Sequence, residues 1–269
     1  MDLSEKTIIV KLSGGKDSTA TLLYMLEHHH VDYVVYQHIP DNMLPESRRH
    51  VEELVRIIEE ETGEKLNLVI IESEPMLKLM REKHKPFPNP KTLWCGYWLK
   101  LVPFRRWLRA LIQQAGLREE DIVIAIGVKR SDSPRRNKML VKPLIQAREL
   151  KTSYKRVALD PGHYYIYAPL LDWSDQDVWR YLERYPRTLE KIKQAYTEYP
   201  NLSACLVCPY HSLKFYRSTP RPVLEKILSM LEEIREMEHI TRFRLGYQLL
   251  LKHIDYVKRV LSEKEVEEK

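Results

Sequence analysis

The sequence predicts an α/β protein with a doubly wound, mostly parallel sheet and a C-terminal helical extension. Short β-branched runs alternate with helical patterns along the chain, which is typical of parallel sheets covered by helices on both faces. Only the helical pattern continues after Pro220. With 269 residues, 43% of them apolar, the chain can bury a large core.

Each predicted element follows from its local pattern. Residues 7–12 form a β-branched run typical of a buried strand, and a helical pattern then extends to about His29. Residues 45–62 place apolar side chains on one helical face and end at Gly63, which favours a helix. The proline-rich residues 84–90 predict a loop at the rim of the sheet. Further strands are predicted at residues 33–36, 66–71 and 121–126.

The C-terminal part of the chain predicts a separate helical element. Its apolar side chains recur at the spacing of one helical stripe. The stripe consists of Leu224, Ile227, Leu228, Leu231 and Ile234. We therefore predict one domain over residues 1–217 and a helical extension over residues 218–269. The stripe either packs within this extension or joins two copies of the chain in a homodimer.

Glycine and polar residues follow the predicted strands where each strand ends. Residues 13–18 follow the first strand, Asp41 lies after the second, and Gly127 ends the strand at residues 121–126. Ligands of doubly wound sheets bind at the carboxyl ends of the strands. The sequence therefore predicts a binding site at this edge of the sheet.

The turn at residues 13–18 reads Ser-Gly-Gly-Lys-Asp-Ser. Its two glycines allow the backbone to approach a ligand closely and to turn N–H groups toward it. The helix that follows adds a positive dipole end, and Lys16 adds a full charge. This composition suits a pyrophosphate group, although the spacing of a Walker A loop is absent. The alternative is a plain glycine turn.

Positive charge is concentrated in the middle of the chain. The whole sequence has 44 Lys and Arg against 38 Asp and Glu, a net charge of +6. Residues 1–90 have 11 basic and 16 acidic side chains, whereas residues 91–156 have 16 basic and 5 acidic ones, a net charge of +11. Such a segment either binds a polyanion, such as nucleotide phosphates or RNA, or is a solvated basic face.

Other features predict a soluble, cytoplasmic protein. No apolar run approaches the length of a membrane-spanning helix, and the mixed-charge start of the chain does not resemble a signal peptide. Three cysteines do not make a disulfide framework. We therefore expect no membrane partner.

Five blocks of the sequence resemble one known family. Residues 13–18 resemble the loop of the PP-loop ATP pyrophosphatases, and four later blocks resemble, in order, motifs of the phosphoadenosine-phosphosulfate (PAPS) reductase family within that superfamily. These blocks are Asp41–Ser47, Trp94–Pro103, Gly127–Arg136 and Pro169–Trp179. The resemblance covers about residues 7–217. It implies an adenine-nucleotide alpha-hydrolase-like fold that binds ATP with Mg²⁺.

The resemblance also implies site residues. Lys16 and Asp17 would be catalytic, because the loop holds the pyrophosphate that leaves ATP and stabilises its charge. Asp17 would orient the loop or help to hold Mg²⁺. Lys129 stands where the family pattern has Arg, and Asp132 stands where it has Glu. The implied nucleotide-binding residues are Ser13, Gly14, Gly15, Lys16, Asp17, Ser18, Asp41, Gly127, Lys129, Arg130, Ser133 and Arg136.

The three cysteines form a candidate metal site. Cys205 and Cys208 make a C-x-x-C-P motif, and Cys95 lies 110 residues upstream. Three thiolates can hold a [4Fe–4S] cluster with one iron left open, which resembles the PP-loop enzymes that insert sulfur into tRNA. The alternatives are zinc ligation, a redox pair, or three unrelated buried thiols.

The favoured function is ATP-dependent adenylation of an acceptor, with release of pyrophosphate, for sulfur transfer. A sulfonucleotide (PAPS or APS) reductase is the second candidate, but it requires a carboxyl-terminal nucleophilic cysteine motif, and no cysteine follows Cys208. A nucleotide-binding subunit without turnover is the third. Expected partners are a nucleotide, a sulfur donor and an acceptor such as tRNA or another nucleic acid.

Overall fold

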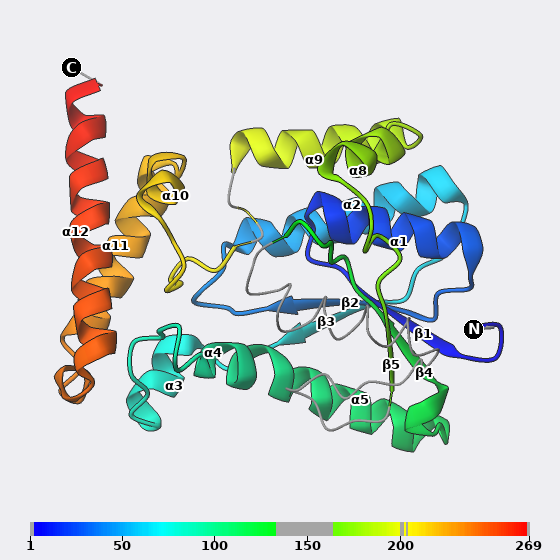
Figure 1. Cartoon of the computed structure of the whole chain (residues 1–269), viewed down its shortest axis with the longest axis horizontal. Coiled ribbons are helices and arrows are strands. Elements are labelled where there is room, and N and C mark those ends of the chain that lie inside the picture. Colours follow the sequence, from blue (N-terminus) through cyan, green and yellow to red (C-terminus); the bar gives the residue numbers. More distant parts are fainter. Residues whose placement is uncertain (1–2, 133–163, 200–201, 203, 268–269) are drawn as a thin grey trace. The chain divides into compact units, whose positions relative to one another are not determined.

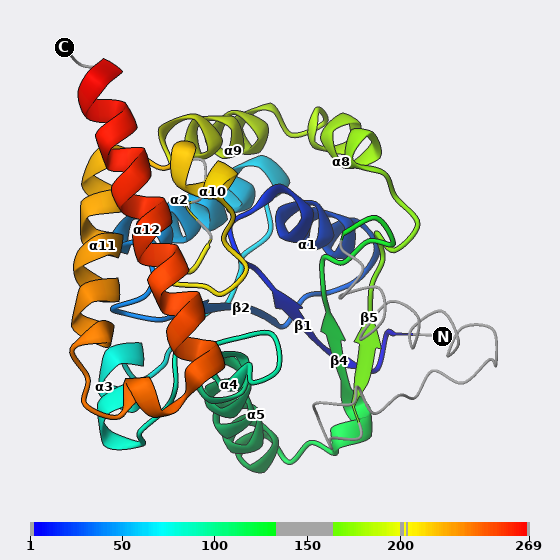
Figure 2. The same cartoon turned by 60° about the vertical axis from the view of Figure 1, so that its left-hand side comes forward.

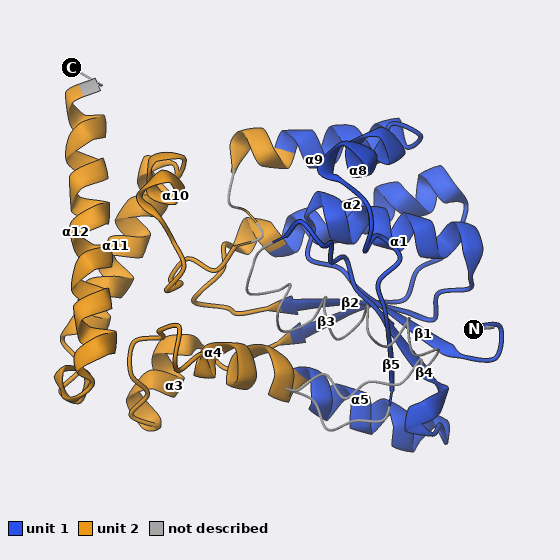
Figure 3. Cartoon of the chain, viewed as in Figure 1, with its two compact units in different colours: residues 1–37, 48–71, 104–194 blue, residues 38–47, 72–103, 195–269 orange. Residues whose placement is uncertain are grey.

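The structure is a computed structural model that describes residues 3–132, 164–199, 202 and 204–267 (Figure 1). The chain forms two compact units, which are coloured in Figure 3. Unit 1 contains residues 1–37, 48–71 and 104–194, and unit 2 contains residues 38–47, 72–103 and 195–269. The predicted helical extension, residues 218–269, lies in unit 2. The predicted boundary between residues 217 and 218 stays a prediction.

A five-stranded sheet forms the centre of the fold. Its strands, in sheet order, are β3 (Leu68–Glu72), β2 (Tyr33–His38), β1 (Thr7–Lys11), β4 (Ile122–Ala125) and β5 (Tyr165–Tyr167). β1 pairs in parallel with both β2 and β4, and β4 pairs in parallel with β5. The strand order reverses between β1 and β4, as at the switch point of doubly wound sheets, where ligands bind.

Helices cover both faces of the sheet in unit 1. α1 and α2 lie over one face and α5 lies over the other, as Figures 1 and 2 show from two sides. Side chains of α5, including Phe104 and Leu108, pack with Ile9 and Ile124 of the strands in one buried cluster. The helices that lie wholly or mostly in this unit are α1 (Lys16–His28), α2 (Pro45–Thr62), α5 (Val102–Ala115), α8 (Asp175–Leu182) and α9 (Pro186–Glu198), with a 3₁₀ turn at Glu119–Asp121. One end of each of α2, α5 and α9 belongs to unit 2.

The helices of unit 2 include the C-terminal pair α11 and α12, which pack along each other in Figure 2. Four residues of the predicted stripe on α11 are buried, so the chain itself covers much of the stripe. The homodimer stays a prediction. The helices of this unit are α3 (Met76–Glu82), α4 (Trp94–Gly96), α10 (Leu213–Arg217), α11 (Arg221–Arg235) and α12 (Arg244–Glu267), with a π-helical turn at Tyr97–Leu101 and a 3₁₀ turn at Ile240–Arg242.

The predicted α/β class, parallel sheet and C-terminal helices are confirmed. The predicted strands lie within two residues of β1 to β4 at each end, and the helix predicted at residues 45–62 is α2. The three-residue strand β5 was not predicted, because it is too short to show a periodic pattern. None of the described helices has the length and apolar character needed to cross a membrane.

Candidate functional site

The turn between β1 and α1 is held by its own polar groups. Ser18 Oγ accepts a hydrogen bond from the Ser13 backbone N–H at 3.0 Å and donates one to the Gly15 carbonyl at 3.0 Å. Gly15 is the N-cap of α1 and has no side chain that could cap the helix. The N-terminus of α1 therefore begins directly at the glycine turn, and helix N-termini at such turns bind anions.

Two glycines of the site are required by geometry. Gly14 has a φ of +82°, a backbone conformation that costs a side-chain-bearing residue free energy. Gly127, which follows β4, lies so close to α1 that a Cβ there would stand 2.7 Å from the Asp17 carbonyl oxygen. The segment that follows β4 therefore packs directly against the first turn of α1 at the switch point of the sheet.

Lys16 projects into a cluster of carboxylates. Its ammonium lies 2.9 Å from Asp17 Oδ1 and 2.7 Å from Asp175 Oδ1, and its side chain is 13% exposed. Two carboxylates therefore balance this lysine, one from its own helix and one from the start of α8. An incoming phosphate would compete with both for the same ammonium.

Lys129 is the second cation of this cluster and is almost fully buried, with 2% of its side chain exposed. Its ammonium donates to Asp17 and lies 3.1 Å from Asp175 and 3.5 Å from Asp132. Burial lowers the pKa of Lys129, but the hydrogen bond to Asp17 and the nearby carboxylates outweigh it, so the pKa is raised. Lys129 is therefore a fixed positive charge at the end of β4.

The sequence analysis did not identify Asp175 as a site residue. Ser174 caps α8 through a capping box with Asp177, which places Asp175 in the first helical position. The hydrogen bonds from Lys16 and Lys129 lower the pKa of Asp175. Asp175 lies 159 residues from Lys16, so no local pattern connects the two. The one sequence signal for Asp175 is that it falls within Pro169–Trp179, a block that resembles a family motif.

His50 is a second residue that sequence reasoning missed. It lies on α2, is 6% exposed, and donates from Nε2 to the Gly14 carbonyl at 2.9 Å. Burial lowers its pKa, so the ring is neutral at neutral pH. A lone histidine on an apolar helix face carries no sequence signal for this role. The hydrogen bond from His50 holds the Gly14 carbonyl and thus the backbone of the loop in place.

Four other predicted nucleotide-binding residues either have partners outside the Lys16–Lys129 cluster or lie outside the described residues. Both oxygens of the Asp41 carboxylate, in unit 2, accept backbone N–H groups at the start of α3, from Met76 and Leu77, each at 2.7 Å. This is a helix-capping role, and nucleotide binding by Asp41 stays a prediction. Arg130 pairs with Asp172 on the exposed surface of unit 1. Ser133 and Arg136 lie outside the described residues.

The three cysteines gather in unit 2. All are half-buried free thiols. Burial raises the pKa of Cys95, and the neighbouring Cys205 raises it further. Burial likewise raises the pKa of Cys208 to about 11, with Cys205 and Cys95 contributing. The fold therefore brings Cys95 to the C-x-x-C motif across 110 residues.

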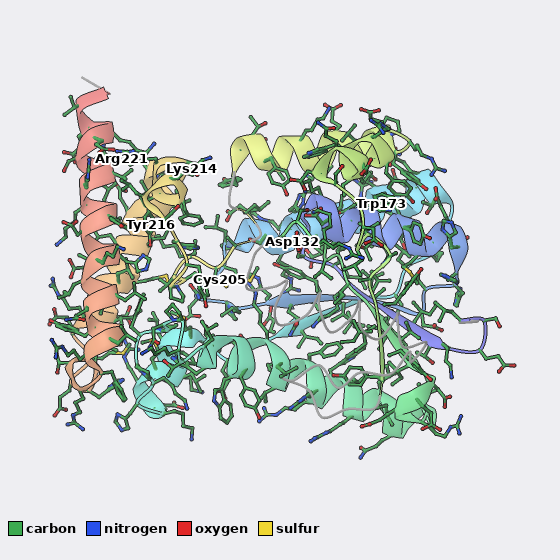
Figure 4. The ribbon with its side chains drawn as sticks, viewed as in Figure 1. Asp132, Trp173, Cys205, Lys214, Tyr216 and Arg221 are labelled. Carbon is green, nitrogen blue, oxygen red and sulfur yellow. The ribbon has the colours of Figure 1, made fainter. Side chains whose placement is uncertain are left out.

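The thiols are close enough to interact electrostatically. Among the described residues, however, no three Cys, His, Asp or Glu side chains are already arranged around a common metal position. The donor chemistry suits iron or zinc, and its metal content stays a prediction. Beside the thiols, the Tyr216 hydroxyl and His253 Nδ1 share a hydrogen bond of 2.8 Å, and Tyr216 lies within electrostatic reach of Cys208. Figure 4 labels Cys205 before α10 and Tyr216 on α10.

Comparison with known proteins places the chain in a family. No curated protein sequence matches it significantly. Two similar solved structures are a 4-thiouridine synthetase–RNA complex with bound ATP and the U34-tRNA thiolase NcsA from Methanococcus maripaludis with its [4Fe-4S] cluster. Each is 15% identical in sequence, with TM-scores of 0.48 and 0.42.

The matches cover 96% of this chain in both cases, but 53% of the synthetase chain and 73% of the NcsA chain. The chain thus spans about half the length of the synthetase. The family model of the phosphoadenosine phosphosulfate reductase domain matches residues 7–197. Because this match covers well over half of the sequence, the chain belongs to the phosphoadenosine phosphosulfate reductase domain family.

Proposed function

We propose that this chain binds ATP at the turn between β1 and α1 and adenylates an acceptor for sulfur transfer. The observation that supports this proposal is the pairing of a helix N-terminus that begins at Gly15 with two ammonium groups, Lys16 and Lys129, at the switch point of a parallel sheet. Helix N-termini and lysines are the groups that hold transferred or leaving phosphates in proteins.

The reaction would proceed by attack on the α-phosphorus of ATP. A nucleophilic oxygen of the acceptor forms a bond to this phosphorus, and the bond to the bridging oxygen of the β-phosphate breaks. Pyrophosphate leaves with the electron pair, and Lys16 and the N–H groups of α1 stabilise the charge that develops on it. Mg²⁺ bound to ATP would neutralise part of the same charge.

Asp17 would keep the two lysines in place during this step, because its carboxylate accepts from both of them. Lys129 is buried and cannot move far, so it supplies a charge that is already oriented before the nucleotide arrives. His50 would hold the loop backbone through the Gly14 carbonyl. Lys16 and Asp17 are thus our proposed catalytic residues, and His50 is a positioning residue.

The thiols of Cys95, Cys205 and Cys208 would serve the sulfur-transfer half of the reaction. We propose that they hold a [4Fe–4S] cluster, which would supply an open iron that binds sulfide. Zinc ligation and a redox pair are the alternatives. Purification without oxygen, followed by iron, sulfide and zinc analysis and by absorption spectra of Cys95→Ser, separates these three cases.

Pyrophosphate release tests the proposed reaction. The full chain would be incubated with ATP, Mg²⁺ and either RNA or single-stranded DNA. We expect release that requires a nucleic-acid acceptor and is lost in Lys16→Ala, whereas Lys65→Ala, which removes an exposed lysine of unit 1, keeps it. Nucleotide binding without release under any acceptor would favour a non-catalytic subunit.

Reductase chemistry is tested with the same protein. Supplied with thioredoxin and PAPS, the chain should produce no sulfite above background, because the sequence contains no cysteine after Cys208. Sulfite that disappears in Cys208→Ser would instead make the sulfonucleotide reductase the correct assignment. A cytoplasmic location, a sulfur donor as partner and a homodimer belong to the same proposal.

A further inference from the structure

Two neighbouring aromatic side chains lie exposed on unit 2, directly after Cys95 in the sequence. Tyr97 is 42% exposed and Trp98 is 41% exposed. Their ring centroids are 5.4 Å apart, and the rings are nearly perpendicular, with an interplanar angle of 85°. Large aromatic side chains normally bury most of their surface in a core or at an interface, so an exposed pair calls for a ligand.

The backbone that carries the pair is held firmly. Tyr97 and Trp98 begin the π-helical turn, and Leu99 of the same turn is 1% exposed. Trp94 Nε1 donates to the Pro86 carbonyl at 2.8 Å, which ties the preceding turn to the proline-rich loop. Irregular π-helical turns frequently occur at functional sites. The aromatic rings are therefore presented on a rigid support.

The segment of the sequence that carries the pair is basic. The Lys85 ammonium lies 5.2 Å from the centroid of the Trp98 ring, a cation–π contact. From Lys83 to Pro103 the sequence contains four lysines and no Asp or Glu, and the next acidic residue is Glu119. The segment that carries the pair is thus basic along the sequence, which fits a polyanionic ligand.

We propose that Tyr97, Trp98 and Lys85 form a stacking platform for unpaired bases of a single-stranded nucleic acid. Exposed aromatic rings that stack on bases, beside lysines that contact phosphates, are the usual means of binding single strands. This inference deepens the proposed function and rests on it, because it names the acceptor as an unpaired nucleotide. A base stacked there would lie on the same helical turn as the Cys95 backbone.

The test measures binding of fluorescein-labelled oligouridine of about 12 nucleotides, within the usual site size of single-strand binders. The full chain is titrated without ATP, beside the DNA equivalent and a duplex of the same length. We expect Trp98→Ala to weaken single-strand binding about 5- to 100-fold, as for the loss of one base stack. Trp98→Phe should retain most of the affinity, and Phe243→Ala, which removes another exposed aromatic side chain of unit 2, should match the parent.

Two further readouts separate stacking from a structural role. Binding of the single strand should quench tryptophan fluorescence in the parent and much less in Trp98→Phe. Lys85→Ala should weaken binding and should reduce the slope of log affinity against log salt concentration by about one. Lys226→Ala, which removes an exposed lysine of unit 2, should change neither. Equal affinity of Trp98→Ala and parent, equal binding of duplex, or a change of oligomeric state in Trp98→Ala would each overturn the proposal.

The outcome is independent of the adenylation reaction. If the chain binds single strands but releases no pyrophosphate, the proposed adenylation is wrong and the stacking platform stands as a nucleic-acid site. If Trp98→Ala releases pyrophosphate at the parent rate with an RNA acceptor at low concentration, the stacking platform is wrong and the proposed adenylation stands. The RNA and DNA arms identify which polymer is bound.

Discussion

Replacing Asp175 by Asn removes a carboxylate that occupies the ammonium groups of the site. Asp175 lies 2.7 Å from the Lys16 ammonium and 3.1 Å from the Lys129 ammonium. A phosphate that binds Lys16 has to replace this contact. We therefore expect Asp175→Asn to bind pyrophosphate and ATP more tightly than the parent.

The size of the effect follows from the exposure of the carboxylate. Its side chain is 69% exposed, so each ion pair is strongly screened and contributes about 0.2–1 kcal/mol. Two such pairs amount to roughly 1 kcal/mol, which corresponds to an affinity gain of about fivefold. Hydrogen bonds from Lys16 and Lys129 lower the pKa of Asp175, so its charge, and with it the competition, persists at neutral pH and is lost only at a pH below the ordinary pKa of an aspartate.

Stability should change in the opposite direction. Asp175 occupies the first turn of α8, where a negative charge stabilises the helix by about 0.3–1 kcal/mol. Asp175→Asn should therefore lower the melting temperature slightly while it raises affinity. Glu183→Gln, an exposed acidic residue just after α8, is the matched control and should leave pyrophosphate affinity unchanged.

Titration calorimetry with pyrophosphate and with Mg²⁺–ATP measures the difference. The gain should shrink when salt is raised from about 0.05 M to about 0.5 M, because screening weakens the competing ion pairs. Weaker binding of ATP by Asp175→Asn would refute the reasoning. It would mean that Asp175 contacts the bound nucleotide or its Mg²⁺ and does not compete with it.

Three further outcomes follow from the site. Lys16→Ala should weaken nucleotide binding by about 1–3 kcal/mol, as for the loss of a charge-assisted hydrogen bond, and equal affinity by calorimetry would contradict it. Gly127→Ala should destabilise the fold or abolish ATP binding, because its Cβ would meet the Asp17 carbonyl at 2.7 Å, and unchanged melting and binding would argue against that close approach. Cys208, whose pKa is raised to about 11, should react with iodoacetamide slowly at neutral pH and faster as the pH approaches 11, and rapid alkylation at pH 7 would contradict the burial of its thiol.

Much of the site could be predicted from the sequence because its central part is local. Residues 13–18 lie together in one turn, and the β-branched run before them and the helical pattern after them place that turn at the carboxyl end of a strand. The Ser174 cap of α8 is equally local, since capping depends on residues three positions apart. Gly127 follows from its position after β4.

The contacts of the cluster could not be predicted in this way. Asp175 reaches Lys16 across 159 residues, and His50 reaches Gly14 across 36. Asp41 accepts hydrogen bonds from the start of α3, a segment that has no sequence signal linking it to Asp41. These contacts depend on how helices pack, and local patterns do not specify side-chain partners far away in the sequence.

The sequence by itself determined the α/β class, the glycine turn after β1 and the family, because β-branched runs, glycines and short motifs act over a few neighbouring residues. Only the tertiary structure decided which charges balance Lys16, that Lys129 is buried among three carboxylates, and that Cys95 joins Cys205 and Cys208. Such encounters are set by sheet order and helix packing, which bring distant segments together once the whole chain has folded.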